Sequence, residues 1–280
     1  ILLRAATDRK PYEALGGGKL QIAETDNAVT ITGDNFSVAF VDGLLTAYTV
    51  NGKNMLAAPL TLQVFRLPTD NERGRTGTYD RMGIRKLDFT PGKLEVTAAK
   101  DKQSATVVAV NSYATSGNNR FTVRQTVDVL ADGVLIVNAT VDPLPKGSEL
   151  PRLGLRAELP KEYENMTWLG RGPHDSYADR KEAAFVGLHH SRVSEEWTNY
   201  VLPQEQGNKE EVRWIAITND AGKGLMVVAP EQIAASAGHW RPEDNYIDGG
   251  NRKKHPCEVD FCEQTILNIV ANIILQRKTV

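Results

Sequence analysis

Apolar and polar residues alternate through most of the chain, with the period of two that marks a half-buried β-strand. The alternation begins at Lys19 and is clearest over residues 121–129 and 134–141. Asp132-Gly133 separates these two runs, and an Asp-Gly pair tolerates the positive φ angles of a tight turn. The two runs therefore predict a β-hairpin.

The same reasoning predicts a meander near the start of the chain. Asp42-Gly43 and Asn51-Gly52 follow alternating runs, so each is expected to turn one strand into the next. Further strands are expected wherever the alternation returns, at 94–98, 105–113, 153–157, 166–170 and 212–216. In the 153–157 strand, Leu153, Leu155 and Ala157 predict one apolar face.

Helical signals are scarce, and the best one covers residues 179–185, which could form two turns. No alternation of strands with ten-residue helices is present, so a parallel α/β fold is excluded. The pattern predicts an all-β, antiparallel sandwich of about 18 strands from the usual spacing. Residues 1–18, ending in Gly16-Gly17-Gly18, are predicted to be a linker, and residues 19–280 one continuous domain.

Composition narrows the function classes. The net charge of −2 gives no field that would attract nucleic acid or anionic lipid. No apolar run approaches the ~20 residues of a membrane span, so we expect a soluble protein, cytoplasmic or periplasmic.

Cys257 and Cys262 are expected to be free thiols. A chain that begins at Ile1 without a leader is expected to be a piece of a longer polypeptide or a processed one.

Two polar stretches are candidates for chemistry. One segment crowds five polar residues within eight positions: Arg66, Asp70, Asn71, Glu72 and Arg73. Such a cluster is typical of a solvated turn and, alternatively, of a loop that contacts a ligand or a neighbouring domain. The second stretch, 150–218, holds Trp168, Trp197 and Trp214, which are expected to be core or interdomain contacts more than sugar platforms. The five histidines show no metal-ligand spacing, so no metal site is predicted.

Several motifs occur in one order that resembles a known family. They are Phe65-Arg66-Leu67-Pro68-Thr69-Asp70-Asn71-Glu72, Leu150-Pro151-Arg152-Leu153-Gly154, Trp168-Leu169-Gly170-Arg171-Gly172-Pro173 with Tyr177, Asp179 and Arg180 after it, Pro203-Gln204-Glu205-Gln206-Gly207-Asn208 with Arg213-Trp214 after it, and Thr265-Ile266-Leu267-Asn268-Ile269. His255, Glu258, Val259 and Asp260 also fit the pattern. The chain resembles the small-chain region of β-galactosidases of glycoside hydrolase family 2 over roughly residues 35–269.

This resemblance implies a super-sandwich of the galactose-mutarotase type, forming the C-terminal domain of an enzyme that hydrolyses terminal β-D-galactose. It implies that the catalytic glutamates lie on a separate barrel domain, so no catalytic residue is predicted here. It also implies no cofactor in this chain, with Mg and Na bound elsewhere in the parent. The expected partners are that barrel, the β-galactoside and further copies of the parent.

The residues expected to face substrate or the barrel are Arg66, Asp70, Asn71, Arg171, His174, Asp175, Tyr177, Gln204, Glu205 and Asn208. The family's C-terminal tryptophan, a sugar platform, has no counterpart in residues 270–280, so the end after about 269 is predicted to be atypical or truncated.

Two other functions remain open. A free-standing mutarotase or aldose-epimerase needs a general acid and base, for which His174 and Glu205 are the candidates. A carbohydrate-binding module would need neither.

Overall fold

The computed structural model describes residues 2–3, 15–117, 119–142, 150–200, 203–246 and 259–270. Within these residues the fold is antiparallel and almost entirely β, with strands β1 to β18, as the alternation predicts. The predicted linker includes Leu2–Leu3, which forms β1 and pairs in parallel with two later strands. Residues 4–14 and 271–280, which belong to the predictions about both chain ends, lie outside the described residues.

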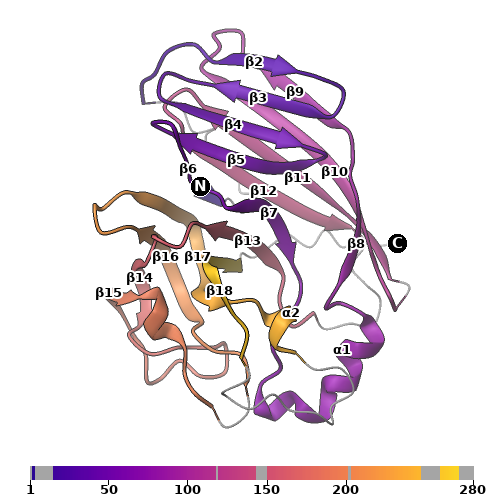
Figure 1. Ribbon diagram of the computed structural model, residues 1–280, viewed down its shortest axis with the longest axis vertical. Coiled ribbons are helices and arrows are strands. Elements are labelled where there is room, and N and C mark those ends of the chain that lie inside the picture. The colour runs from indigo at the N-terminus through magenta and orange to yellow at the C-terminus, as the bar shows by residue number, and fades with distance from the viewer. Residues whose placement is uncertain are drawn as a thin grey trace.

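A five-stranded sheet forms one layer of the molecule (Figure 1). Its strands are β2 (Gln21–Glu24), β3 (Ala28–Thr32), β4 (Phe36–Val41), β5 (Leu44–Val50) and β6 (Lys53–Asn54). Asp42 and Asn51 have φ angles of 47° and 50°, and the glycine after each is also at positive φ. Both turns therefore have the conformation that their sequences predict.

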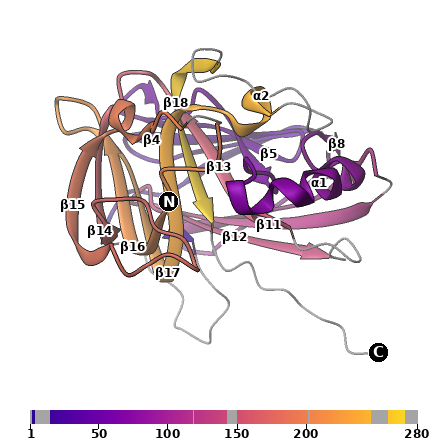
Figure 2. The ribbon, with the colours of Figure 1, turned by 90° about the horizontal axis from the view of Figure 1, so that it is seen from below.

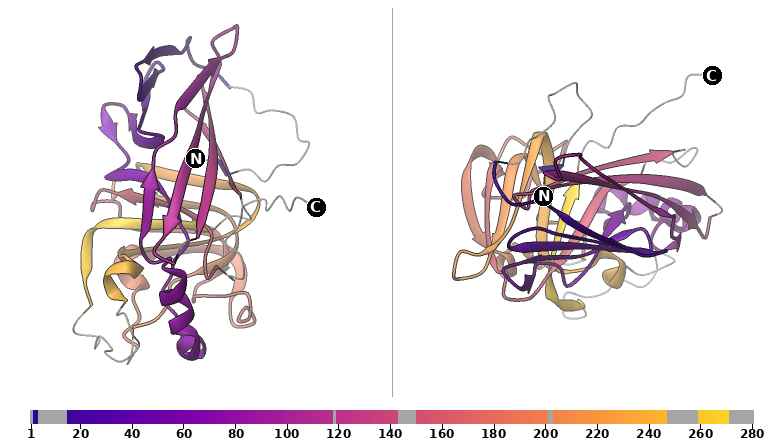
Figure 3. Two further views of the ribbon diagram at one scale, coloured as in Figure 1. Left: turned by 90° about the vertical axis from the view of Figure 1, so that its right-hand side faces the viewer. Right: turned by 90° about the horizontal axis from the view of Figure 1, so that it is seen from above.

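The large sheet begins with β7 (Ala58–Gln63), β8 (Leu87–Thr90), β9 (Leu94–Ala98), β10 (Ser104–Thr115), β11 (Arg120–Leu130) and β12 (Leu135–Asp142). β11 and β12 form the hairpin predicted around Asp132-Gly133. The five-stranded sheet and β9–β12 face each other as two layers in the side view of Figure 3. Their alternate apolar residues, such as Val38 and Val127, share one core.

The second half of the large sheet is β13 (Gly154–Leu159), β14 (Asn165–Gly172), β15 (Phe185–Arg192), β16 (Lys209–Thr218), β17 (Gly224–Trp240) and β18 (Phe261–Val270). Seen from below, β14–β17 curve beside β13 and β18 (Figure 2). Trp168 and Ile215 from this half belong to the same core cluster as the upper layers. The described core is therefore continuous across both halves.

One prediction about local structure is wrong. Residues 179–185 form no helix, because Phe185 already begins β15 and the carbonyls of Lys181 and Ala184 accept bonds from Arg171. Among the described residues the helices are instead four short segments: η1 (Asp70–Arg75), α1 (Thr76–Met82), η2 (Val193–Glu196) and α2 (Pro242–Asn245). No helix among the described residues has the length and apolar character of a membrane span.

β13 has the single apolar face that its alternation predicts, with Leu155 and Ala157 in the core, and its opposite, polar face is buried as well. Its polar residues are accommodated by ion pairs. Arg156 bonds both carboxylate oxygens of Glu243 in α2 at 3.0 and 2.9 Å, and Glu158 accepts two bonds from Arg241. The short helix α2 and the residue before it therefore cover the polar face of this strand.

Candidate interdomain cleft

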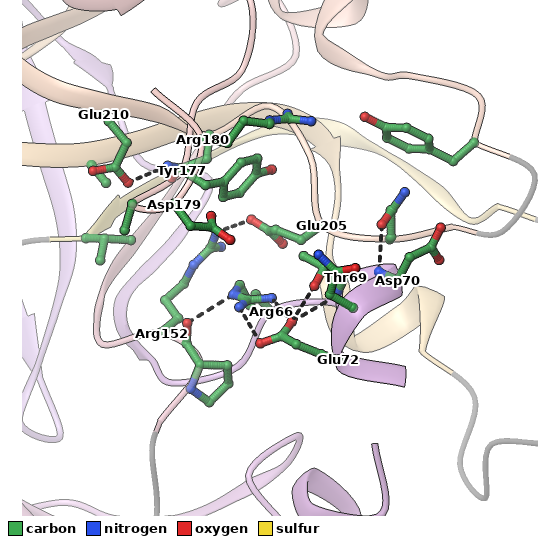
Figure 4. A pocket seen from close by; sticks show the side chains of 18 residues that line it. Arg66, Thr69, Asp70, Glu72, Arg152, Tyr177, Asp179, Arg180, Glu205 and Glu210 are labelled. Carbon is green, nitrogen blue, oxygen red and sulfur yellow. Dashed lines mark hydrogen bonds and ion pairs between the residues drawn. The ribbon is translucent and has the colours of Figure 1, made fainter. Parts of the chain in front are cut away.

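One cleft of about 520 Å³ collects most of the sequence-predicted site residues (Figure 4). Four segments far apart in the chain form it: the loop and η1 after β7, the residues just before β13, the turn after β14, and the loop before β16. The C-terminal end of β18 borders it through Val270, beside Ala234 of β17. Five carboxylates and three guanidinium groups line it, which gives many groups that can bond hydroxyls: Asp70, Glu72, Asp179, Glu205, Glu210, Arg66, Arg152 and Arg180.

Arg66 and Glu72 fix the loop at the bottom of the cleft. Two guanidinium nitrogens of Arg66 donate to the two carboxylate oxygens of Glu72, at 2.7 and 2.8 Å. Arg66 also donates to the carbonyl of Pro151, at 3.0 Å, which ties this loop to the strand β13 region. The backbone N–H of Thr69 and the hydroxyl of Tyr79 donate to Glu72 as well.

Glu72 therefore carries an unusually stable negative charge. Partial burial alone would raise the pKa of its carboxyl, but the hydrogen bonds from Arg66, Thr69 and Tyr79 and the charge of Arg66 outweigh it and lower the pKa to about 2. Such a carboxylate is an anchor for the loop and is unsuited to proton transfer near neutral pH.

Arg152 and Glu205 form a second, deeper ion pair, with side chains only 3% and 5% exposed. Burial raises the pKa of Glu205, and the positive charges of Arg152 and Arg66 oppose that effect. The pair joins the segment before β13 to the loop before β16. A pair this buried costs much of its attraction in desolvation, so its main effect is to fix the position of that loop.

The turn at Tyr177–Arg180 forms the third wall. Tyr177 and Arg180 exchange backbone hydrogen bonds, and Arg180 pairs with Asp175 at 2.7 Å. Asn208 holds the turn from the other side, donating to the carbonyl of Ser176 at 2.8 Å. The buried hydroxyl of Tyr177 has no hydrogen-bond partner among the described residues, and burial raises its pKa, as do the charges of Glu205 and Asp175.

Seven of the ten predicted site residues line this cleft: Arg66, Asp70, Asn71, Tyr177, Gln204, Glu205 and Asn208. Gln204 accepts a bond from the backbone N–H of Asp70, at 2.9 Å, which connects two motifs 134 positions apart. Asp175 supports the wall through Arg180. The structure therefore assembles motifs that sequence could only place one after another.

Arg171 and His174 lie apart from this assembly. Arg171 pairs with Glu211 at 2.9 Å and bonds the carbonyls of the 181–184 turn. His174 is exposed and does not line the cleft, whereas Glu205 is buried in its ion pair. The acid and base suggested for a mutarotase are therefore not presented together in this cleft.

The sequence prediction omitted several lining residues, among them Glu72, Arg152, Asp179 and Arg180. Each of these residues stands inside or beside a motif quoted above, and that position in the sequence could have identified it as a site residue. The arginines of these motifs have local partners. Arg66 pairs with Glu72, Arg171 pairs with Glu211, and Arg213 bonds the carbonyl of Glu211.

The tryptophans take different roles. Trp168 is fully buried, and its indole N–H donates a hydrogen bond to the carbonyl of Arg171. The buried ammonium group of Lys209 lies 5.0 Å from the centre of its ring. Trp214 is half-buried on the outer face of β16, in a cross-strand row with Leu169, Leu188 and Val228. Among the described residues, no group of three or more His, Cys, Asp or Glu side chains could hold a metal ion.

Comparison with known proteins places the chain in a family. The family described as "Beta galactosidase small chain" matches residues 32–273. The chain belongs to this family. The β-galactosidase of Halalkalibacterium halodurans is 30% identical over 258 residues, which are 90% of this chain and 25% of the relative.

Two further relatives are similar to this chain over about four fifths of its length. The β-galactosidase BgaC of Bifidobacterium adolescentis is 32% identical over 234 residues, covering 81% of this chain and 22% of that protein. The β-galactosidase of Priestia megaterium is 29% identical over 227 residues, covering 80% and 22%. The small-chain region thus spans about a quarter of these relatives.

Proposed function

We propose that this chain is the supporting C-terminal domain of a β-galactosidase that hydrolyses terminal non-reducing β-D-galactose residues with retention. Its family membership and the names of its relatives support the reaction. Its cleft would form part of the mouth of a catalytic barrel carried elsewhere on the parent polypeptide. Mg and Na, expected of the family, would bind outside this chain.

The observation that supports a catalytic pair outside this chain is that two carboxylates of the cleft are held in ion pairs. A retaining glycosidase needs one carboxyl free to attack the sugar and another free to donate a proton, about 5–5.5 Å apart. Glu72 is held by Arg66, and Glu205 is held by Arg152. Both carboxylates are engaged in positioning loops, so the catalytic pair is assigned to the barrel.

The polar rim would then meet the substrate or the barrel. Asp70, Asn71 and Asp179 are exposed and line the same opening. Carboxylates and amides of this kind bond sugar hydroxyls and also the polar groups of a neighbouring domain. The anchored loops beneath them would keep that surface rigid.

The test has two parts. Purified chain should hydrolyse no chromogenic β-galactoside above a mock preparation, because it lacks the barrel. In a chimera, this chain replaces the matching quarter of the Priestia megaterium enzyme; the chimera should hydrolyse the substrate, whereas the same enzyme truncated before that region should not.

Hydrolysis by the isolated chain would contradict the assignment of the glutamates to the barrel. A chimera that elutes as a folded protein in size-exclusion chromatography and is as inactive as the truncated enzyme would contradict the supporting role. The folding measurement separates that outcome from a chimera that simply aggregates.

A further inference from the structure

A second hollow of about 480 Å³ lies away from the cleft, at the opposite end of the β17–β18 ladder. The cleft is bordered by Ala234 and Val270, which are paired in this ladder, whereas the hollow is bordered by Trp240 and Phe261, which are paired at its other end. The six residue-to-residue steps from Ala234 to Trp240 correspond to about 20 Å of strand. The hollow is therefore a separate site.

Three aromatic rings form its apolar walls. The Trp197 ring lies 5.0 Å from the Trp240 ring at 73°, and 5.2 Å from the Phe261 ring at 79°. The rings thus meet nearly edge to face. Phe261 is 57% exposed and Trp197 is half-buried, so aromatic surface remains open to solvent.

Charged groups surround these rings. Glu164 and His239 form a close pair at the inner side, and His239 also bonds the carbonyl of Gln264 at 3.0 Å. Lys161 and Glu263 stand 3.9 Å apart at the rim, with side chains 69% and 78% exposed. Each can still bond a ligand, because exposed pairs at this distance bind each other weakly.

We propose that this hollow is a carbohydrate site, which takes a pyranose ring. One face of such a ring presents C–H groups that pack on an aromatic surface, while its edge presents hydroxyls. Phe261 and Trp197 offer the aromatic surface. Glu263 accepts hydroxyl hydrogen bonds, and Lys161 donates to hydroxyl oxygens. The proposal does not depend on the cleft or on the assigned hydrolysis.

The charged rim favours a sugar over an apolar protein segment. A segment of protein packed on the three rings would have to cover Lys161 and Glu263 as well, and their attraction across 3.9 Å is too weak to offset the free energy lost when both charges leave water. A sugar leaves both side chains partly in water while bonding them.

The experiment uses the purified chain and methyl β-D-galactopyranoside. Tryptophan fluorescence should change with saturation, with a dissociation constant on the order of 1 mM, as suits a small ligand with few contacts. Saturation-transfer NMR should show the C–H protons of one ring face close to aromatic protons. Methyl β-D-glucopyranoside shows whether the ring alone or the axial hydroxyl of galactose is recognised, and binding of either supports the site.

Phe261→Ala should weaken binding about tenfold, because it removes an exposed stacking surface. The matched control is Phe185→Ala, which removes another exposed phenylalanine, 74% exposed, on β15 outside the hollow. The control should bind like the unaltered chain. Thermal unfolding verifies that both variants remain folded.

Absence of saturable binding with both sugars would overturn the proposal. Binding that is equal in Phe261→Ala and Phe185→Ala would also overturn it, since the sugar would then occupy another surface. Because the readout is binding and not hydrolysis, either failure is distinct from a failure of the β-galactosidase assignment.

Discussion

Two arginine–carboxylate pairs hold the cleft together at the level of single residues. Arg66–Glu72 is partly exposed and closes one local loop, whereas Arg152–Glu205 is buried and joins distant segments. Their energetics differ accordingly. A partly exposed pair contributes through its hydrogen bonds, while a buried pair stabilises little in itself and costs much when one partner is lost.

Arg152→Ala should therefore lower the free energy of unfolding by about 3–5 kcal/mol, because it leaves Glu205 buried without a partner. In the double variant Arg152→Met with Glu205→Met, the free energy of unfolding should be higher than that of the unaltered chain or within about 1 kcal/mol of it. Urea denaturation measures both. If the double variant were as unstable as Arg152→Ala, the loss of the ion pair itself, and not the unpaired charge of Glu205, would account for the lower free energy of unfolding.

Glu72 predicts how stability depends on pH. Its pKa of about 2 in the folded chain lies below its ordinary value of 4.5, so its contribution is full above about pH 4.5 and is lost as the pH falls toward 2. Glu72→Gln should cost about 2–3 kcal/mol at pH 7. The gap between the two proteins should close as acid is added, in denaturation curves taken from pH 7 to 2. A gap independent of pH would contradict the assigned cause.

At the level of helices and strands, the elements that the sequence predicts correctly are those determined by neighbouring residues. The turns at Asp42-Gly43 and Asn51-Gly52 and the β11–β12 hairpin each depend on neighbouring residues, and all are confirmed. The 179–185 segment was mispredicted because a distant side chain, Arg171, binds its carbonyls. The α1 segment, with Thr and Gly at its start, lacks the composition that favours a helix.

Gly154 links β13 to β18 through close backbone contact. An ideal Cβ at this position would lie 2.2 Å from the carbonyl oxygen of Ile269, an atom that cannot rotate away. Gly154→Ala should therefore destabilise the chain by about 1–3 kcal/mol. Gly16→Ala, where nothing lies within 4 Å of the added carbon, is the control and should be neutral. Equal unfolding midpoints for the two variants would contradict this account.

For the whole molecule, the sequence pattern predicted the all-β class, since alternation is repeated in so many strands. The cleft could not be predicted in the same way. Its decisive contacts, such as Asp70 with Gln204 and Arg152 with Glu205, join segments 134 and 53 positions apart. One sequence gives no distance between such residues. The resemblance in motifs named segments that meet at the cleft, and it also named Arg171 and His174, which do not line it.

The continuous core predicts how the chain unfolds. Ile31 of the five-stranded sheet and Ile215 of β16 belong to the same buried cluster. Ile31→Ala and Ile215→Ala should each cost about 2–5 kcal/mol. In calorimetry both should shift one common transition to lower temperature. Two transitions, each moved by only one variant, would mean that the two halves unfold independently.

The length of β17 sets a fixed spacing between the cleft and the aromatic hollow. Because a paired strand neither stretches nor folds back, the two openings stay about 20 Å apart along it. A single sugar ring can occupy only one of them. If the cleft also takes a sugar, as proposed above, a branched or extended glycan with two suitable ends could bridge both, and its second contact would then form at a high effective concentration. The strand would act as a ruler that distinguishes long saccharides from short ones by avidity.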